Sequence, residues 1–173
     1  MVKLKDETAS DLPNAIESQI DILEQITGTL DLEEVLKRIV EAAVQLTEAD
    51  EGSLLLLDND SGELYMRAAK GFGEEYVKTF RQKVNDDSIA GQVMLTGESI
   101  LIGPEMADSP IKVKTGYIAK SLINVPIIQG DNTTGVLAVY NKGGRHPFTP
   151  DHLRYLNPLA KYAATAIKNA HRY

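Results

Sequence analysis

The stretch SLINVPII-QGDNTT-GVLAVYN, residues 121–141, decides the fold class of this chain. Two apolar runs, Ser121–Ile128 and Gly135–Asn141, flank the polar and glycine-containing stretch Gln129–Thr134. Apolar runs of this length on either side of turn-forming residues are typical of two strands joined by a tight loop. The sequence therefore predicts an antiparallel hairpin here, with residues 129–134 as its loop.

A second hairpin is predicted earlier in the chain. The apolar run Ser53–Leu57 is followed by the turn-forming sequence Asp58–Gly62 and then by Glu63–Ala69. Ser99–Ile102 is typical of a further short strand, and Met106–Ala119 of irregular chain. Short strands separated by tight turns favour an antiparallel sheet.

Two long helices are predicted, one before and one after these strands. Asp31 can cap the first helix, whose apolar face extends to Leu46. Thr149 and Pro150 start the second helix, which keeps helical spacing to Ala170. With antiparallel strands between them, the two helices predict an α+β domain in which the terminal helices pack on one face of the sheet.

Shorter helices are expected within the domain. Glu74–Gln82 carries apolar side chains on one face, and Asp87–Gly97 has a capping residue at its start and glycine at its end. Pro158 lies inside the last helix and predicts a kink there.

A further helix is predicted before residue 31. Asp11 and Pro13 signal its start, and a narrow apolar stripe of the coiled-coil kind follows. The sequence therefore divides into a tail (1–11), a signalling or dimerisation helix (12–30) and a domain that includes the last helix (31–173). Small side chains on the last helix permit close approach of another helix. The predicted dimer interface consists of Ile16, Ile20, Leu23, Ile26, Ala163, Ile167 and Ala170.

Composition excludes several classes of protein. The 173 residues contain no cysteine, which removes disulfides, thiolate metal sites and cysteine nucleophiles. The net charge of −7 disfavours non-specific nucleic-acid binding. No apolar run approaches the roughly 20 residues that a membrane span needs, and the N-terminal residues do not resemble a signal peptide. A cytoplasmic domain with no membrane partner is expected.

The charges are unevenly distributed. Residues 1–60 carry fifteen acidic and four basic side chains, whereas residues 61–173 carry ten and fourteen. The basic excess of the second part is consistent with a site for an anion there. The acidic excess of the first part is also explained by solvated helix faces alone.

Three segments, taken together, resemble the GAF domain family of small-molecule sensors: Leu32–Leu54, Asp87–Ile100 and the hairpin Ser121–Asn141. The resemblance covers roughly residues 20–172, and Phe148–Asp151 is similar to the start of the family's last helix. It implies a PAS-related fold with a central antiparallel sheet of five or six strands and the terminal helices on one face. Short helices and loops on the other face would form a ligand pocket. It also implies dimerisation through the terminal helices and an output domain, on a longer chain or separate.

The resemblance also bears on cofactors. Covalent bilin attachment and the family's methionine sulfoxide reductases need cysteine, so both are excluded. Haem needs an axial ligand, and His146, His152 and His171 lie apart from any second site feature. Haem and bound metals are therefore not expected, and the cofactor, if any, stays unknown.

Cyclic-nucleotide-binding members of the family carry the signature N-K-x(n)-F-x3-D-E. Asn141, Lys142 and Phe148 match it, but Asp151 comes one residue early and His152 stands where an acid is expected. The match leaves open both a cyclic-nucleotide site and an ordinary strand end. It also leaves open an ion pair between Lys142 and Asp151.

A ligand site can be proposed from the residues expected on the pocket face. The start of the helix at Asp87 exposes backbone N–H groups that attract anions, unless Asp87 itself caps them. Lysines cluster downstream, and aromatic residues could form a wall for a planar ligand. The predicted ligand-binding residues are Phe72, Ser88, Ile89, Ala90, Lys112, Lys114, Tyr117 and Tyr140.

No catalytic constellation is recognisable. The serines have no histidine in a suitable arrangement, and no phosphate-binding glycine loop of the P-loop type is present. The sequence predicts a non-catalytic regulatory sensor in signal transduction that binds a small, anionic, planar ligand such as a cyclic nucleotide and relays through a helical homodimer. The alternative is a ligand-free dimerisation or protein-interaction module of a kinase, cyclase or transcription regulator.

Overall fold

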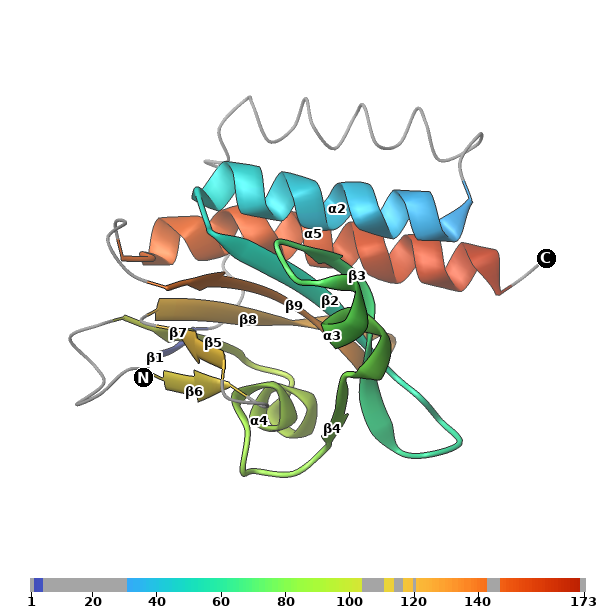
Figure 1. Ribbon diagram of the computed structural model, residues 1–173. Coiled ribbons are helices and arrows are strands. Elements are labelled where there is room, and N and C mark those ends of the chain that lie inside the picture. The colour runs from blue at the N-terminus through green and yellow to red at the C-terminus, as the bar shows by residue number, and fades with distance from the viewer. Residues whose placement is uncertain are drawn as a thin grey trace.

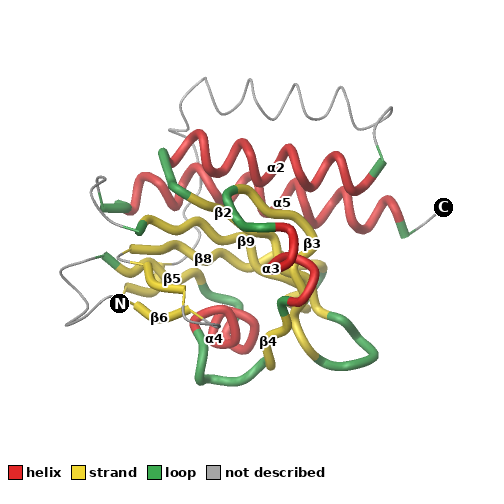
Figure 2. The backbone as a smooth tube through the Cα atoms, in the orientation of Figure 1, coloured by secondary structure: helices red, strands yellow, loops and turns green. Residues whose placement is uncertain are grey.

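The computed structural model describes residues 2–4, 31–103, 111–113, 117–119, 121–142 and 147–171. One antiparallel sheet lies between two layers (Figure 1). Two long helices cover one face, and the short helices with a small two-stranded sheet lie on the other (Figure 2). The predicted α+β class and layering are confirmed. The predicted helix 12–30, with Ile16, Ile20, Leu23 and Ile26, lies outside the described residues.

The main sheet has seven strands in the described part of the chain, all paired antiparallel to their neighbours. Six of these strands form the sheet of five or six strands that was expected. The seventh is the edge strand at Val2–Leu4, within the segment that was expected to be a tail. The order across the sheet is β1 (Val2–Leu4), β5 (Ser99–Ile102), β8 (Ser121–Gln129), β9 (Asn132–Asn141), β2 (Glu51–Leu57), β3 (Glu63–Lys70) and β4 (Arg81–Lys83).

Both predicted hairpins are present. In the β8–β9 hairpin Gln129 already pairs with Asn132, so the turn is shorter than the expected loop. Gly130 supports this turn with a φ of 62°, a left-handed conformation that favours glycine. Two short strands lie within the stretch that was expected to be irregular, where β6 (Ile111–Val113) pairs with β7 (Tyr117–Ala119).

The helices begin where their capping residues predict. The Asp31 carboxylate accepts a hydrogen bond from the Glu34 amide at 2.9 Å and starts α2 (Leu32–Thr47). The last helix, α5 (Pro150–Ala170), continues through Pro158. The two short helices are α3 (Glu74–Thr79) and α4 (Ile89–Thr96). The helix expected over 74–82 was predicted too long, because residues 81–83 pair with β3 as strand β4. None of the helices in the described ranges has the length and apolarity to cross a bilayer.

The sheet separates two apolar cores. The larger lies between the sheet and helices α2 and α5, and the smaller lies under α3 and α4. Ala163 and Ile167, which were expected in a dimer interface, are buried in the larger core of their own chain, whereas Ala170 is exposed. The core therefore accounts for the apolar character of Ala163 and Ile167, and the dimer stays a prediction.

Candidate ligand-binding site

The sheet face toward α4 carries four buried polar side chains on its three central strands. Alternation along the strands directs Glu51 and Ser53 of β2, Asn124 of β8 and Tyr140 of β9 to this face. We call these four residues the polar cluster. In register, Ala138 of β9 lies between Ser53 and Asn124, and Tyr140 lies beside Glu51.

Three oxygen atoms of the polar cluster are buried without a hydrogen-bond partner among the described residues: Glu51 Oε2, Ser53 Oγ and Asn124 Oδ1. The residues themselves are only 4%, 0% and 2% exposed. Buried polar atoms in folded proteins are nearly always paired. An unpaired one costs about 1–3 kcal/mol, so three on one sheet face make this face the candidate site.

Tyr140 carries a second buried hydroxyl in the polar cluster, beside that of Ser53. Burial is the main cause that raises the pKa of Tyr140 to about 12, and the charges of Tyr76 and Glu51 act in the same direction. The Ser53 side chain partly offsets this, although Ser53 Oγ does not reach hydrogen-bonding geometry with any described residue. The Tyr140 hydroxyl is therefore protonated at neutral pH.

An aromatic group adjoins the polar cluster. The ring of Phe72 meets Tyr140 edge-on at 5.9 Å and stacks on Tyr76 at 5.3 Å, and Tyr76 in turn lies 5.8 Å from Phe80. Phe72 and Tyr140 were both predicted from the sequence to line a ligand site, and the structure brings them into contact. Such offset and edge-on contacts stabilise each pair by about 0.5–1.5 kcal/mol.

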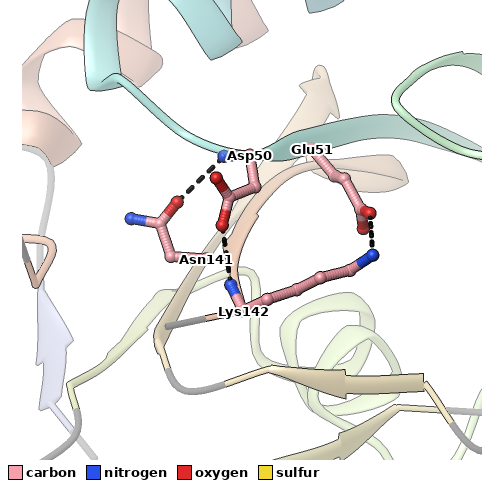
Figure 3. Close-up of polar contacts among 4 residues, drawn as sticks. All are labelled: Asp50, Glu51, Asn141 and Lys142. Atoms are coloured by element: carbon pink, nitrogen blue, oxygen red, sulfur yellow. Dashed lines mark hydrogen bonds and ion pairs between the residues drawn. The ribbon is translucent and has the colours of Figure 1, made fainter. Parts of the chain in front are cut away.

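The polar cluster is braced at one end where β2 begins and β9 ends (Figure 3). Asn141 Oδ1 accepts a hydrogen bond from the Asp50 amide at 2.9 Å, and Asp50 Oδ2 accepts one from the Lys142 amide at 2.9 Å. Lys142 Nζ lies 2.7 Å from Glu51 Oε1. The brace therefore holds one oxygen of the Glu51 carboxylate, while the other oxygen is the unpartnered one.

The partner of Lys142 differs from the one left open by the sequence. Its described ion pair is with Glu51, and Asp151 instead lies 3.8 Å from Arg154 on its own helix. The hydrogen bond and the charge of Glu51 raise the pKa of Lys142. A pattern of side chains along β9 could not reveal this pair, because Glu51 lies 91 positions earlier in the chain.

The start of α4 was predicted to attract an anion. Ser88, and not Asp87, caps this helix, since Ser88 Oγ accepts a hydrogen bond from the Gly91 amide at 2.9 Å. Ser88, Ile89 and Ala90 are half-buried there, beside the exposed Asp86 and Asp87. The described surroundings of this helix end are therefore acidic, which does not favour an anion.

The other predicted ligand residues cannot be placed as side chains. Lys112 lies in β6 and Tyr117 in β7, where only the backbone is described, and Lys114 lies outside the described residues. Their part in a ligand site stays a prediction.

A hollow lies on the other side of the sheet, which α2 and α5 cover. It has a volume of about 630 Å³ and is bounded by the β2–β3 turn with Asp58 and Asp60, the β8–β9 hairpin, and Ile167 and His171 of the last helix. None of the predicted ligand-binding residues lines it. The described residues contain no group of three or more possible metal ligands, so the acidic turn is not a metal site of that kind.

His152, one of the histidines considered for haem, has a structural role at the start of α5. Its Nδ1 accepts a hydrogen bond from the Thr149 amide at 3.0 Å, which completes a capping box. Burial is the main cause that lowers the pKa of His152 below 6.5, against the opposing charges of Asp151 and Glu48.

This cap predicts a loss of stability in mild acid. Because the pKa of His152 is lower in the folded chain than its usual 6.5, the unfolded chain binds more protons as the pH falls through that value, and folding becomes less favourable. Protonation also converts the Nδ1 acceptor into a donor, so the Thr149 bond is lost. Between pH 7 and pH 5 the free energy of unfolding of the wild type should fall by about 0.5–1 kcal/mol more than that of His152→Gln, because glutamine retains an acceptor that does not titrate. Urea unfolding at both pH values measures this, and equal losses in the two proteins would contradict it.

The chain matches known proteins over most of its length. Residues 29–168 match the family model of the GAF domain. A probable 3′,5′-cyclic phosphodiesterase of Caenorhabditis elegans is 29% identical over 154 residues, 82% of this chain and 21% of that protein. The chain thus spans about a fifth of this relative.

Solved structures with low sequence identity share the fold. The GAF domain of a phosphoenolpyruvate-protein phosphotransferase of Acinetobacter is 21% identical, with a TM-score of 0.79 and coverage of 93% of this chain and 96% of that one. The free methionine-R-sulfoxide reductase of Neisseria meningitidis, solved with its substrate, is 18% identical, with a TM-score of 0.74 and 98% coverage of both chains. GAF domains occur within multidomain signalling proteins. With a family model that matches residues 29–168 and a fold shared with solved members, this chain belongs to the GAF domain family.

Proposed function

We propose that the chain is a non-catalytic sensor domain that binds a small molecule between the sheet and the layer formed by α3 and α4. The observation that carries this proposal is the set of three unpartnered buried oxygens on that face. A fold that retains such costly atoms has a reason to do so when an external partner satisfies them. The aromatic group of Phe72 and Tyr140 supports a planar ligand.

The ligand class follows from the wider context. The basic excess of residues 61–173 supports an anionic molecule, and the relative named as a cyclic-nucleotide phosphodiesterase supports a nucleotide. A cyclic nucleotide combines a planar base with a single negative charge. It is the first candidate, without covalent bilin, haem or metal as cofactor.

The signal would pass from the ligand to the helices through the sheet. Ser53 on the ligand face is followed by Leu54, which packs in the core under α2 and α5. A displacement of β2 at the ligand face would therefore also move side chains in the core under α2 and α5. We propose that the helices relay this change through a homodimer in a cytoplasmic signalling protein, to an output domain on a longer chain or on a separate one.

The alternative is a ligand-free interaction module. It is supported by two large apolar side chains on the surface, Leu95 of α4 and Ile128 of β8, which are 61% and 44% exposed. Exposed apolar side chains of this size are found at protein contacts, although single ones are common.

Native mass spectrometry of freshly purified protein tests the two functions together. The sensor predicts a dimer mass with a retained small molecule, or heat on calorimetric titration with cyclic AMP or cyclic GMP. Haem, biliverdin and short organic acids serve as comparison compounds. A protein that carries no added mass and gives no heat with any of these compounds would rule out the sensor, and a dimer in that result would favour the interaction module.

A further inference from the structure

We infer that the ligand presents N–H hydrogen-bond donors to the polar cluster, through an amidine, a primary amide or an amino-substituted ring. This inference rests on the proposed function, because it concerns the same face of the sheet. It goes further in assigning the hydrogen-bonding polarity of the ligand edge that meets Glu51, Ser53 and Asn124.

The chemistry of the three unpartnered atoms gives this polarity. An ionised carboxylate oxygen and an amide oxygen can only accept hydrogen bonds, and a hydroxyl can accept or donate. Glu51 Oε2 and Asn124 Oδ1 are therefore satisfied only by donors. A phosphate or carboxylate of the ligand would leave both atoms unpaired and would be repelled by Glu51, so any anionic group of the ligand must lie away from this edge.

The places of these residues on the sheet allow a planar group of about one ring to reach more than one of them. Ser53 and Asn124 both pair with Ala138, so they stand on the two strands that flank β9, roughly 10 Å apart between backbones. Glu51 lies two residues before Ser53 on the same strand face, about 7 Å away. The small side chain of Ala138 lies between Ser53 and Asn124 in the strand register.

The charge balance at Glu51 favours donors that are neutral or singly positive. Lys142 already balances the Glu51 carboxylate through Oε1 at 2.7 Å, and Oε2 stays available. A planar group with adjacent N–H bonds can reach a carboxylate oxygen and a neighbouring acceptor together, which is the geometry that makes amidine and guanidine contacts strong. The Phe72 ring beside Tyr140 gives such a group an apolar edge to pack against.

Three isosteric probes separate donors from acceptors: benzamidine, benzamide and benzoate. They share the same ring and differ in its substituent. Benzamidine offers hydrogen-bond donors only, benzamide offers donors and an acceptor, and benzoate offers acceptors only. Titration of the full chain, followed by amide chemical shifts in two-dimensional NMR, should show benzamidine and benzamide shifting amides of β2, β8 and β9. Benzoate should leave these amides unchanged up to about 10 mM, a range that reaches millimolar dissociation constants.

Variants test the atoms themselves. Asn124→Leu and Ser53→Ala should each weaken benzamidine binding about tenfold, since each removes one hydrogen bond. Asn124→Asp keeps the acceptor oxygens and discards the donor, so it should retain binding. Asn132→Leu and Asn132→Asp are the matched controls, because Asn132 is an exposed asparagine on the same hairpin, and neither should change affinity.

The outcomes distinguish this inference from the proposed function. Benzoate binding as tightly as benzamidine, loss of benzamidine binding in Asn124→Asp, or no binding of any probe would overturn the donor inference. A natural ligand retained in native mass spectrometry would still support the sensor in those cases. A retained ligand with N–H donors, together with the expected order of the probes, would support both.

Discussion

Gly91→Ala is expected to lower the free energy of unfolding by about 2–3 kcal/mol. Helix propensity alone predicts the opposite, because alanine in a helix is about 1 kcal/mol more favourable than glycine. The reason is steric, since a Cβ at Gly91 would lie 2.0 Å from the Asn85 carbonyl oxygen and 2.8 Å from Ser88 Oγ. Both atoms belong to the turn that starts α4, so either this turn or the helix must move.

Urea unfolding monitored by circular dichroism measures this change. Gly73→Ala is the matched control, because a Cβ at Gly73 meets no atom within 4 Å, and its effect should stay within about 0.5 kcal/mol. Since α4 covers the polar cluster, Gly91→Ala should also weaken binding of any ligand there. A Gly91→Ala protein as stable as the wild type would show that the approach of residue 85 to α4 is not as close as described.

Asn124→Leu is expected to raise the free energy of unfolding by about 1–3 kcal/mol while it weakens ligand binding. The substitution replaces a buried oxygen that has no hydrogen-bond partner with an apolar group of similar volume, so the cost of desolvating that oxygen disappears. Ser53→Ala should stabilise in the same direction, by about 1 kcal/mol. Stability gained at the expense of function is the expected behaviour of residues kept for binding.

Thermal and urea unfolding of the ligand-free proteins provide the measurement. Ser121→Ala is the control for Ser53→Ala, because Ser121 is also buried on the sheet, at 2% exposure, and its hydroxyl is not among the unpartnered atoms. It should not stabilise the chain. If Asn124→Leu and Ser53→Ala were instead destabilising, their oxygens would have satisfied partners in the free protein, and the argument for a ligand at the polar cluster would fail.

The fold was predictable from local signals where these are strong. Caps at Asp31 and Thr149, the proline at position 150 and the apolar runs of the two hairpins predicted the elements that the structure contains. Each of these signals acts within a few residues, so it does not depend on distant parts of the chain.

The errors occur where pairing with a distant segment decides the structure. Val2–Leu4 forms β1 through pairing with Ser99–Leu101, almost a hundred residues later, and three residues cannot show an alternating pattern. Arg81–Lys83 pairs with Glu63–Tyr65 of β3, on the other side of helix α3 in the sequence, although its own sequence continues a helical pattern. The polar ends of β8 and β9 extend as strands, because hairpin pairing overrides their turn-forming composition.

The candidate site was predicted only in part. Phe72 and Tyr140 were recognised as aromatic residues and lie in contact, whereas Glu51, Ser53 and Asn124 were not recognised. One signal was available: Asn124 is a lone amide within the apolar run SLINVPII. A polar residue inside a buried strand needs a partner or a function. That its oxygen has no partner follows only from the packing of three strands and cannot be inferred from the sequence.

The two helical layers are anchored unequally, and this difference would determine how the proposed ligand enters the site. No residue of α3 is buried, and the buried residues of α4 are Gly91 and Val93, whereas α2 and α5 each bury seven. Local opening costs least where little surface is buried, so α3 and α4 can detach briefly while the sheet and the long helices stay folded. A ligand would then bind and dissociate only when α3 and α4 are detached from the sheet. Its residence time would depend on the rate of this local opening.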